Sequence, residues 1–287
     1  MVTTSSTLSV VIPVYLRNQS DLLFLERALN SLYSQTLVPH EVIISNDSSP
    51  VFDDELKRLI SRYHKLKINF VRNIFERGIS HNSNNGIKHA KSKFIHVLHQ
   101  DDWIIDPNFY LELELYIKSS ANTFFLLPWK RLEVFQTPQF DLTALLGNNR
   151  VGGPSGVIFP NEPSHLFDDE LSMLCDVDFV YRLFKKIGKP QIFPKYVIEY
   201  GVSDGQAQNQ ITSGEFSNEI GKLFAKHNLS IGRILFLALT RLQPEVSYGI
   251  AKHLESLRAP FFTRVCLAVA KLYCRISIRF RNGITYK

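Results

Sequence analysis

Acidic side chains follow two apolar runs of this sequence, at positions where they could bind a cation. Asp47 lies in the turn after Val42-Ile43-Ile44, and Asp101 and Asp102 follow the run from Phe94 to Leu98. Two adjacent carboxylates repel one another, so such a pair often has a cation nearby. Aspartates are also common in turns and at helix caps, which gives each acid an ordinary structural explanation. The acids predict a divalent-cation site only if the fold brings them together.

The elements around these acids predict such a fold. The run from Leu8 to Val14 is typical of a buried strand, and leucines recur at helical spacing after Asp21. Strand and helix patterns alternate as far as Pro107, which indicates an α/β fold with a mostly parallel central sheet flanked by helices. The carboxyl ends of its strands, with Asp47 and Asp101, should share one rim. The predicted strands are 8–14, 42–44, 68–71, 94–98, 123–127, 155–159 and one within 192–200, and the predicted helices are one from 21 and then 53–63, 83–90, 108–119 and 175–187.

The glycine-rich loops that commonly bind nucleotide phosphates are absent from the sequence. A dinucleotide-binding domain has glycines after its first strand, whereas the residues here are Tyr15-Leu16-Arg17-Asn18-Gln19. The Gly-x-x-x-x-Gly-Lys loop of phosphate-binding ATPases is missing as well. If the protein binds a nucleotide, we therefore expect its phosphates on a divalent metal held by carboxylates.

Several segments occur together in a characteristic order. They are Leu8 to Val14, Asn46-Asp47-Ser48-Ser49, Gly78-Ile79-Ser80 to Asn85-Gly86-Ile87, Leu98-His99-Gln100-Asp101-Asp102, Phe167-Asp168-Asp169-Glu170-Leu171 and Cys175-Asp176-Val177-Asp178. With these segments, roughly the first 200 residues resemble the family 2 inverting glycosyltransferases, which have a GT-A fold with a Rossmann-like nucleotide-binding half. The resemblance implies transfer of a sugar from a nucleotide-sugar, usually a UDP-sugar, with inversion at the anomeric carbon.

The resemblance assigns nucleotide contacts to the strand ends. Pro13 to Tyr15 match the family's contact to the nucleobase, and Asp47 matches the aspartate that hydrogen-bonds the uracil ring. The family turn usually has two acids, and here Asn46 takes the place of the first. Asparagine both donates and accepts hydrogen bonds, so this replacement bears on which base is bound. Arg77 and Gly78 fall where the family often contacts the nucleotide.

The resemblance also implies a metal site. Asp101 matches the second acid of the family's Asp-x-Asp motif, and His99 stands in the place of the first. An imidazole can ligate Mn²⁺ or hydrogen-bond the ribose, but it is a poor ligand for Mg²⁺. The expected cofactor is a divalent metal, Mn²⁺ or Mg²⁺, and Asp102 either assists or only caps the next turn.

Inverting transfer needs a base that takes the proton of the acceptor hydroxyl. Asp176 matches the aspartate of the family's Glu-Asp motif, which has that role, whereas Cys175 replaces the glutamate. Asp178 is a rival two residues along, and the structural alternative makes Asp176 the N-cap of a helix. Gly152 to Ser155 matches a segment that usually borders the sugar and acceptor pocket.

The C-terminal end carries the excess positive charge. The net charge is +6, and from Lys252 onward eight basic residues stand against the single acid Glu255. On a helix the basic residues would line one face and apolar residues another, which is typical of a helix at a membrane interface; packing on the body of the protein is the alternative. Few aromatic residues alternate with the basic ones, so nucleic acid is not expected as a partner. Without a secretory signal or a spanning segment, we expect a cytoplasmic protein, peripheral at the inner face of a membrane.

These inferences combine into one hypothesis. Residues 1–215 are expected to form a GT-A glycosyltransferase domain and residues 216–287 a helical, basic, amphipathic C-terminal extension. The predicted reaction is metal-assisted inverting transfer from a nucleotide-sugar to a hydroxyl of a glycan, such as a lipid-linked polysaccharide, O-antigen or capsule precursor. One alternative is a degenerate nucleotide-sugar-binding module without catalysis, since His99 and Cys175 both replace acids. Another is a nucleotidyl- or phosphoryl-transferring enzyme on a similar sheet.

Overall fold

The computed structural model describes residues 6–74, 76–119, 122–140, 144–146, 149–202 and 213–228. The predicted basic C-terminal helix lies outside the described residues, as does most of the polar segment 201–214. Two compact units divide the chain: Met1–Gln139 with Val151–Gln206, and Phe140–Arg150 with Ala207–Lys287. The first unit holds every predicted site residue, while the domain division at residue 215 stays a prediction.

A seven-stranded sheet forms the centre of the first unit, in the order β10-β6-β9-β4-β1-β2-β3. The four strands from β4 to β3 are parallel, as predicted, and β9 is antiparallel to both of its neighbours. The carboxyl ends of β4, β1 and β2 therefore lie side by side. The strands are β1 (Leu8–Val14), β2 (Glu41–Asn46), β3 (Ile68–Arg72), β4 (Phe94–Val97), β6 (Phe125–Leu126), β9 (Val157–Pro160) and β10 (Gln191–Ile192).

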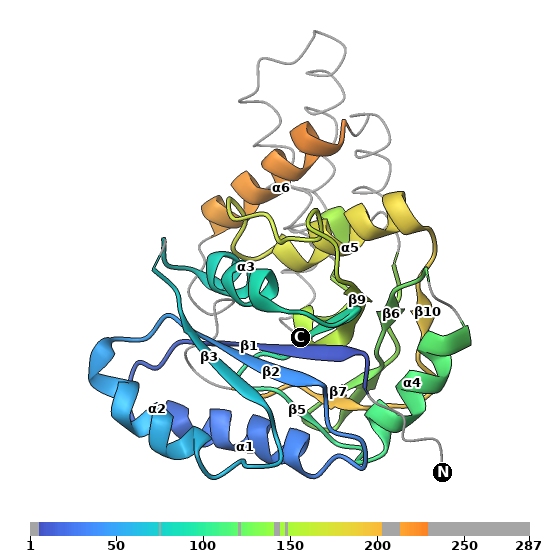
Figure 1. Cartoon of the computed structure of the whole chain (residues 1–287). Helices are drawn as coiled ribbons and strands as arrows, with labels where there is room; N and C mark the ends of the chain where they lie inside the picture. Colours follow the sequence, from blue (N-terminus) through green and yellow to red (C-terminus); the bar gives the residue numbers. More distant parts are fainter. Residues whose placement is uncertain are drawn as a thin grey trace, which may run out of the picture. The chain divides into compact units, whose positions relative to one another are not determined.

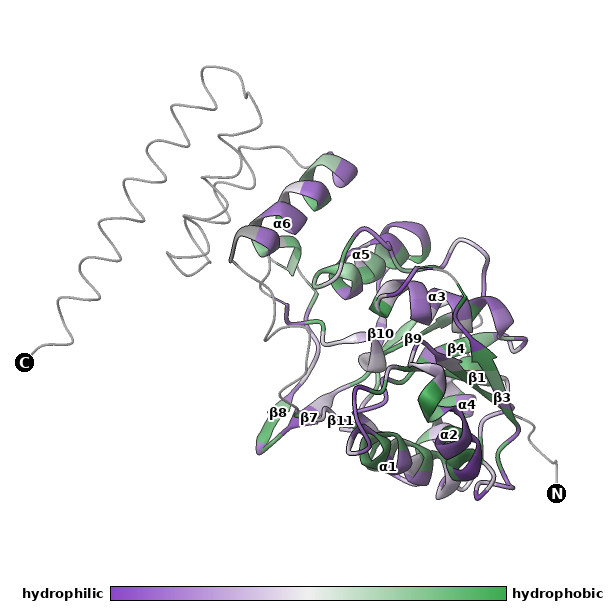
Figure 2. Ribbon diagram, turned by 90° about the vertical axis from the view of Figure 1, so that its left-hand side faces the viewer, coloured by the Kyte–Doolittle hydropathy of each residue, from purple (hydrophilic) through white to green (hydrophobic). Residues whose placement is uncertain are grey.

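Helices cover both faces of this sheet, which is why its strands read as continuous apolar runs. Figure 1 shows α1 and α2 on one face and α3 and α5 on the other. All residues of β1, β2 and β4 are buried, and Figure 2 shows β1 coloured as apolar between the helical layers. The helices of this unit are α1 (Asp21–Tyr33), α2 (Asp53–Ile60), α3 (Ile79–His89), α4 (Phe109–Ser119) and α5 (Cys175–Ile187).

A second, four-stranded sheet in the same unit was not predicted from the sequence. Its order is β5-β11-β7-β8, and its strands are two or three residues long, too short to show an alternating pattern. The single strand predicted within 192–200 is in fact two: β10 belongs to the large sheet and β11 to the small one. The strands of the small sheet are β5 (Trp103–Ile104), β7 (Trp129–Arg131), β8 (Val134–Gln136) and β11 (Ile198–Glu199).

Helix α3 begins earlier than the apolar pattern indicated. It starts at Ile79 rather than at Ser83, directly after Gly78, whose φ of +142° suits glycine. The start was missed because most of the buried face of α3 consists of Ser and Asn side chains, which carry no hydrophobic period. Gly86 lies against β1: a Cβ there would come within 2.4 Å of Val11 Cγ1, so the helix packs unusually close to the sheet.

The second unit contains helix α6 (Ser213–His227) and a short 3-10 helix at Ala144–Leu146. Ile220, Leu223 and Phe224 on α6 are buried, as are Ala144 and Leu145. Within the part of the chain that the structure describes, none of the helices has the length and hydropathy needed to cross a membrane.

Candidate functional site

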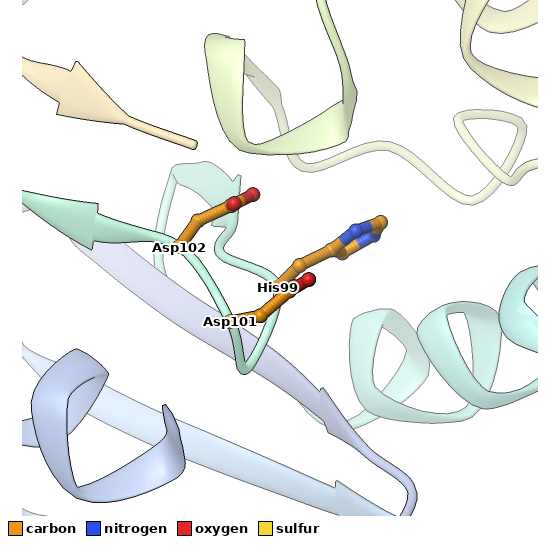
Figure 3. Close-up of side chains that lie close together, drawn as sticks. All are labelled: His99, Asp101 and Asp102. Carbon is orange, nitrogen blue, oxygen red and sulfur yellow. The ribbon is translucent and has the colours of Figure 1, made fainter. Parts of the chain in front are cut away.

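Three potential metal ligands lie together in the turn between β4 and β5. One ligand atom from each of His99, Asp101 and Asp102 lies within 4.8 Å of the others. Figure 3 shows the three side chains on the same turn, which leads from the end of β4 into the strand β5. The predicted cluster of side chains at this strand end is therefore present, and its ligand types suit a divalent cation.

Asp102 also fastens this turn to two other segments. Its Oδ2 accepts a hydrogen bond of 2.6 Å from Ser155 Oγ, and its Oδ1 accepts one of 3.0 Å from the Gly201 N–H. Burial, and after it the charge of Asp101, raise the pKa of the Asp102 carboxyl well above its usual range. A cation held beside the turn would oppose this rise, so the acidic pair and a metal stabilise each other.

His99 has the properties of a neutral ligand. Burial lowers the pKa of its imidazole, although the charge of Asp101 opposes this effect, so the ring is neutral near pH 7. Its Nε2 is buried and has no hydrogen-bond partner among the described residues. A buried nitrogen without a partner is costly unless something occupies it. Together with the two carboxylates, it fits a divalent metal.

The segment that contains Ser155 lies beside the turn of His99, Asp101 and Asp102, which we call the metal turn. This segment is hydrogen-bonded to the core. The carbonyl of Ser155 lies 2.8 Å from His96 Nε2, and the Tyr110 hydroxyl lies 2.9 Å from His96 Nδ1. Because a carbonyl only accepts, Nε2 carries the proton and Nδ1 accepts from Tyr110. Burial lowers the pKa of His96 to about 4, so it stays neutral. His96 thus has a structural role, with both ring nitrogens hydrogen-bonded in the core.

Behind the turn, a cation faces the acidic pair. Arg27 Nη2 donates to the backbone carbonyl of Asp101 at 2.8 Å, and its guanidinium lies 3.5 Å from the centre of the Trp103 ring. Stacking on an aromatic face and a fixed hydrogen bond both orient a guanidinium. Trp103 therefore serves to hold Arg27, which in turn fixes the peptide of Asp101.

The metal turn is also joined to the end of β1, where the nucleobase contact was predicted. The Tyr15 N–H donates to Gln100 Oε1 at 2.8 Å, and Gln100 Nε2 donates back to the Tyr15 carbonyl at 3.1 Å. Pro13 is buried within β1, while the Tyr15 side chain is 47% exposed and so accessible to a ligand. Gln100 was not singled out in the sequence, because a pair of bonds to a distant backbone leaves no local pattern.

Asp47 lies at the end of β2, next to β1, as predicted. Its Oδ1 accepts from Asn73 Nδ2 and its Oδ2 accepts from the Gly78 N–H, both at 3.1 Å. These bonds join the end of β3 and the start of α3 to this carboxylate. Arg77 and Gly78 are exposed next to it, so the residues predicted to contact the nucleotide are neighbours here.

Asn46 has a local role in this turn. Its Oδ1 accepts from the Ser48 N–H at 2.9 Å, and its Nδ2 donates to Asp53 at 3.3 Å. An asparagine that closes such a turn keeps the strand end in shape. These bonds account for both ends of the Asn46 amide.

Asp176 lies in the first turn of α5 and is largely buried. The N-cap of this helix is Leu174, so the alternative of Asp176 as the N-cap is wrong. Asp178 is fully buried, and its Oδ2 accepts from Arg182 Nε at 2.8 Å. That ion pair commits Asp178 to the packing of α5 and gives Arg182 a buried partner.

The hydroxyl of Tyr200 binds the Gly152–Ser155 segment. It accepts from the Gly153 N–H at 2.8 Å. Burial is the main cause that raises the pKa of this hydroxyl well above its usual range, and the charges of Asp102 and Asp176 raise it further. The charges of both carboxylates therefore act on the same hydroxyl. The Gly152–Ser155 segment, which was expected to border the site, supplies partners for Tyr200 and Asp102.

Comparison with known proteins gives the family. The family model described as glycosyl transferase family 2 matches residues 9–134, which run from β1 through the metal turn to the start of β8. Residues 9–134 belong to glycosyl transferase family 2. A curated Campylobacter jejuni protein, GalNAc(5)-diNAcBac-PP-undecaprenol beta-1,3-glucosyltransferase, is 29% identical over 102 residues, covering 34% of this chain and 30% of that protein.

Solved structures of glycosyltransferases share the fold of this chain. Residues 1–349 of Staphylococcus aureus TarS, in complex with UDP-GlcNAc, match with a TM-score of 0.68 and 16% identity over 98% of this chain and 93% of that one. The mannosyltransferase PcManGT from Pyrobaculum calidifontis, in complex with GDP-Man and Mn²⁺, matches with a TM-score of 0.62 and 14% identity over 99% and 89%. The chain thus has the predicted GT-A architecture. It spans 30% of the curated relative and 53% of a longer TarS chain.

Proposed function

We propose that this protein is a metal-dependent inverting glycosyltransferase that uses a nucleotide-sugar, with UDP as the preferred nucleotide. The observation that carries the proposal is the cluster of His99, Asp101 and Asp102 at the carboxyl end of β4, within a family 2 domain. TarS and PcManGT, which share the fold, are described with UDP-GlcNAc and with GDP-Man and Mn²⁺. Asp47 at the end of β2 supports uracil as the base, because its carboxylate can accept a hydrogen bond from the N–H of the uracil ring.

Each proposed role follows from position and chemistry. Asp101 and His99 would ligate the metal, which when bound neutralises charge on the diphosphate. Tyr15, Asp47, Arg77 and Gly78 would contact the nucleotide along the neighbouring strand ends. Since an imidazole suits Mn²⁺ better than Mg²⁺, we expect Mn²⁺ to support binding more strongly.

Asp176 is the proposed general base. The acceptor hydroxyl forms its bond to the anomeric carbon while the bond from that carbon to the diphosphate oxygen breaks on the opposite face. The hydroxyl proton passes to Asp176, and the nucleoside diphosphate leaves with the bonding electrons. A shared site is supported by the charges of Asp176 and Asp102, which both act on the Tyr200 hydroxyl. A base must approach the proton that it takes to about 2.6–3.2 Å between heavy atoms.

Thermal shift with nucleotide-sugars tests the proposal directly. UDP-glucose, UDP-galactose, UDP-GlcNAc and UDP-GalNAc are compared with GDP-mannose, each with Mn²⁺, with Mg²⁺ and without metal. At least one UDP-sugar should raise the melting temperature with Mn²⁺, because a ligand that binds only the folded state stabilises it. Release of UDP would then distinguish a transferase from the degenerate binding module that Cys175 suggests. A chain that no UDP-sugar stabilises with Mn²⁺ contradicts the proposal.

For the acceptor we propose a lipid-linked glycan at the inner face of a membrane. The Campylobacter jejuni relative carries PP-undecaprenol in its name, and the sequence from Lys252 onward has an amphipathic, basic pattern suited to anionic lipid. Deleting the residues from Ala259 onward should release the protein from vesicles that contain phosphatidylglycerol, measured by co-sedimentation. Equal sedimentation of the full and shortened chains would contradict the membrane role of this segment.

A further inference from the structure

Helix α3 is fixed firmly to the strands that carry the proposed donor site. Asn82 Nδ2 donates to the carbonyl of Val14 at 3.1 Å, and Ser45 Oγ donates to Asn82 Oδ1 at 2.7 Å. Asn85 Nδ2 adds a bond of 2.9 Å to the same Ser45 hydroxyl. Gly86 leaves no space for a side chain against Val11, so α3 packs closely on β1 at this point.

Another part of α3 binds the segment that leads into α5. Asn84 Nδ2 donates to the Phe167 carbonyl at 2.9 Å, and the Phe167 N–H donates to Asn84 Oδ1 at 2.8 Å. The buried Asn84 amide thus forms hydrogen bonds with both the N–H and the carbonyl of Phe167. Ser80 Oγ adds a bond of 3.1 Å to the carbonyl of Leu171, five residues before Asp176.

The same segment is bound to α5 at its other side. Arg182 Nη2 donates to the carbonyl of Leu166 at 2.6 Å, while its Nε donates to the buried Asp178. The ring of Phe167 stacks on Phe179, with ring centres 4.4 Å apart and 29° between the planes. A continuous set of contacts therefore runs from β1 and β2, through α3 and the 166–171 segment, to the helix that bears Asp176.

We propose that Asn84 is a positioning residue that sets Asp176 at its working distance from the nucleotide-sugar. The inference rests on the proposed function, because it takes Asp176 as the base. A base displaced by about 1 Å can lose on the order of 100-fold in rate. Asn84 acts through the Phe167 backbone and touches neither the strand ends nor the metal turn in the bonds described, so nucleotide binding does not depend on it.

The substitution Asn84→Asp tests this with little change in shape. The carboxylate still accepts from the Phe167 N–H, but it has no proton for the Phe167 carbonyl and repels that oxygen. We expect kcat for UDP release to fall about 10- to 100-fold. The dissociation constant of UDP with Mn²⁺, measured by calorimetry, should stay within about 2-fold, since UDP occupies the strand ends. Equal losses in UDP affinity and kcat would overturn the positioning role.

Cys175 supplies a readout that needs no catalysis. This thiol is buried in the first turn of α5, next to Asp176. In a background with Cys266→Ser and Cys274→Ser, the rate at which a thiol reagent labels Cys175 measures opening of that turn. Asn84→Asp should raise this rate about 10-fold or more, and an unchanged rate would overturn the proposal. If the unaltered protein released no UDP, the proposed function would fail, while the labelling result would still decide the role of Asn84.

Two variants complete the experiment. Asn30→Asp introduces the same charge on the exposed part of α1, where Asn30 Oδ1 only accepts from the Tyr63 hydroxyl at 3.0 Å, so kcat and labelling should not change. Ser80→Ala removes the bond to Leu171 without adding charge. Ser80→Ala should lower kcat and raise the labelling rate of Cys175, as Asn84→Asp does, but by a smaller factor. If Asn84→Asp does not fold, Ser80→Ala takes its place in the test. A Ser80→Ala protein that matches the unaltered one in both measurements would also contradict the proposal.

Discussion

Asp101→Asn should abolish Mn²⁺-dependent binding of the nucleotide, and turnover with it. Asparagine keeps the size of the side chain but removes the negative charge that a divalent cation requires. The turn would then offer only the neutral His99 and Asp102, whose two oxygens already accept from Ser155 and Gly201. Removing a residue that only hydrogen-bonds a metal ligand typically lowers metal affinity about 10–100-fold, and loss of the ligand itself should cost more. Calorimetry with UDP and Mn²⁺ should therefore show binding at least ~100-fold weaker.

Controls separate the loss of a ligand from the loss of charge in general. Asp54→Asn removes an exposed acid from α2 and should leave binding unchanged. His99→Asp exchanges the imidazole for a carboxylate, so it should keep nucleotide binding while shifting the preference from Mn²⁺ towards Mg²⁺. If Asp101→Asn bound UDP with Mn²⁺ as tightly as the unaltered protein, Asp101 would not be a ligand, and the metal site would have to lie elsewhere.

The parts of the site on regular elements could be predicted from the sequence. The runs that form β1, β2 and β4 are mostly apolar and buried, so their ends at Val14, Asn46 and Val97 were predicted correctly or within one or two residues. Parallel topology then put Asp47 and Asp101 at the ends of strands on either side of β1. The ends of these strands follow from local pattern and sheet geometry alone.

The bonds that hold the site in shape could not be predicted. Gln100 contacts Tyr15, which is 85 positions away, and Asp102 contacts Gly201, 99 positions away. Such pairs join irregular segments whose paths no hydrophobic period describes. The first turn of helix α3 could not be predicted for a related reason. The buried face of α3 is mostly Asn and Ser, and these residues usually indicate a loop.

Asp176→Asn should remove the chemical step while leaving nucleotide binding intact. An asparagine is the same size and its oxygen can still accept from the Val177 N–H, as Asp176 Oδ1 does at 2.7 Å, so the first turn of α5 should keep its form. It cannot take a proton from an acceptor hydroxyl. General-base catalysis contributes about 10²- to 10⁴-fold, so kcat should fall by that factor, while UDP binding with Mn²⁺ stays within about 2-fold.

Asp178→Asn is the matched variant on the same helix turn, and the contrast between the two assigns the base. Asp178 is fully buried and paired with Arg182, so Asp178→Asn should lower the melting temperature by leaving that cation without a negatively charged partner. Asp176→Asn should instead leave the melting temperature nearly unchanged and remove the acidic limb of the kcat profile, since that limb reports protonation of the base. If Asp178→Asn abolished turnover in a stable protein while Asp176→Asn retained it, the base would be Asp178, and its pairing with Arg182 would have to open during catalysis.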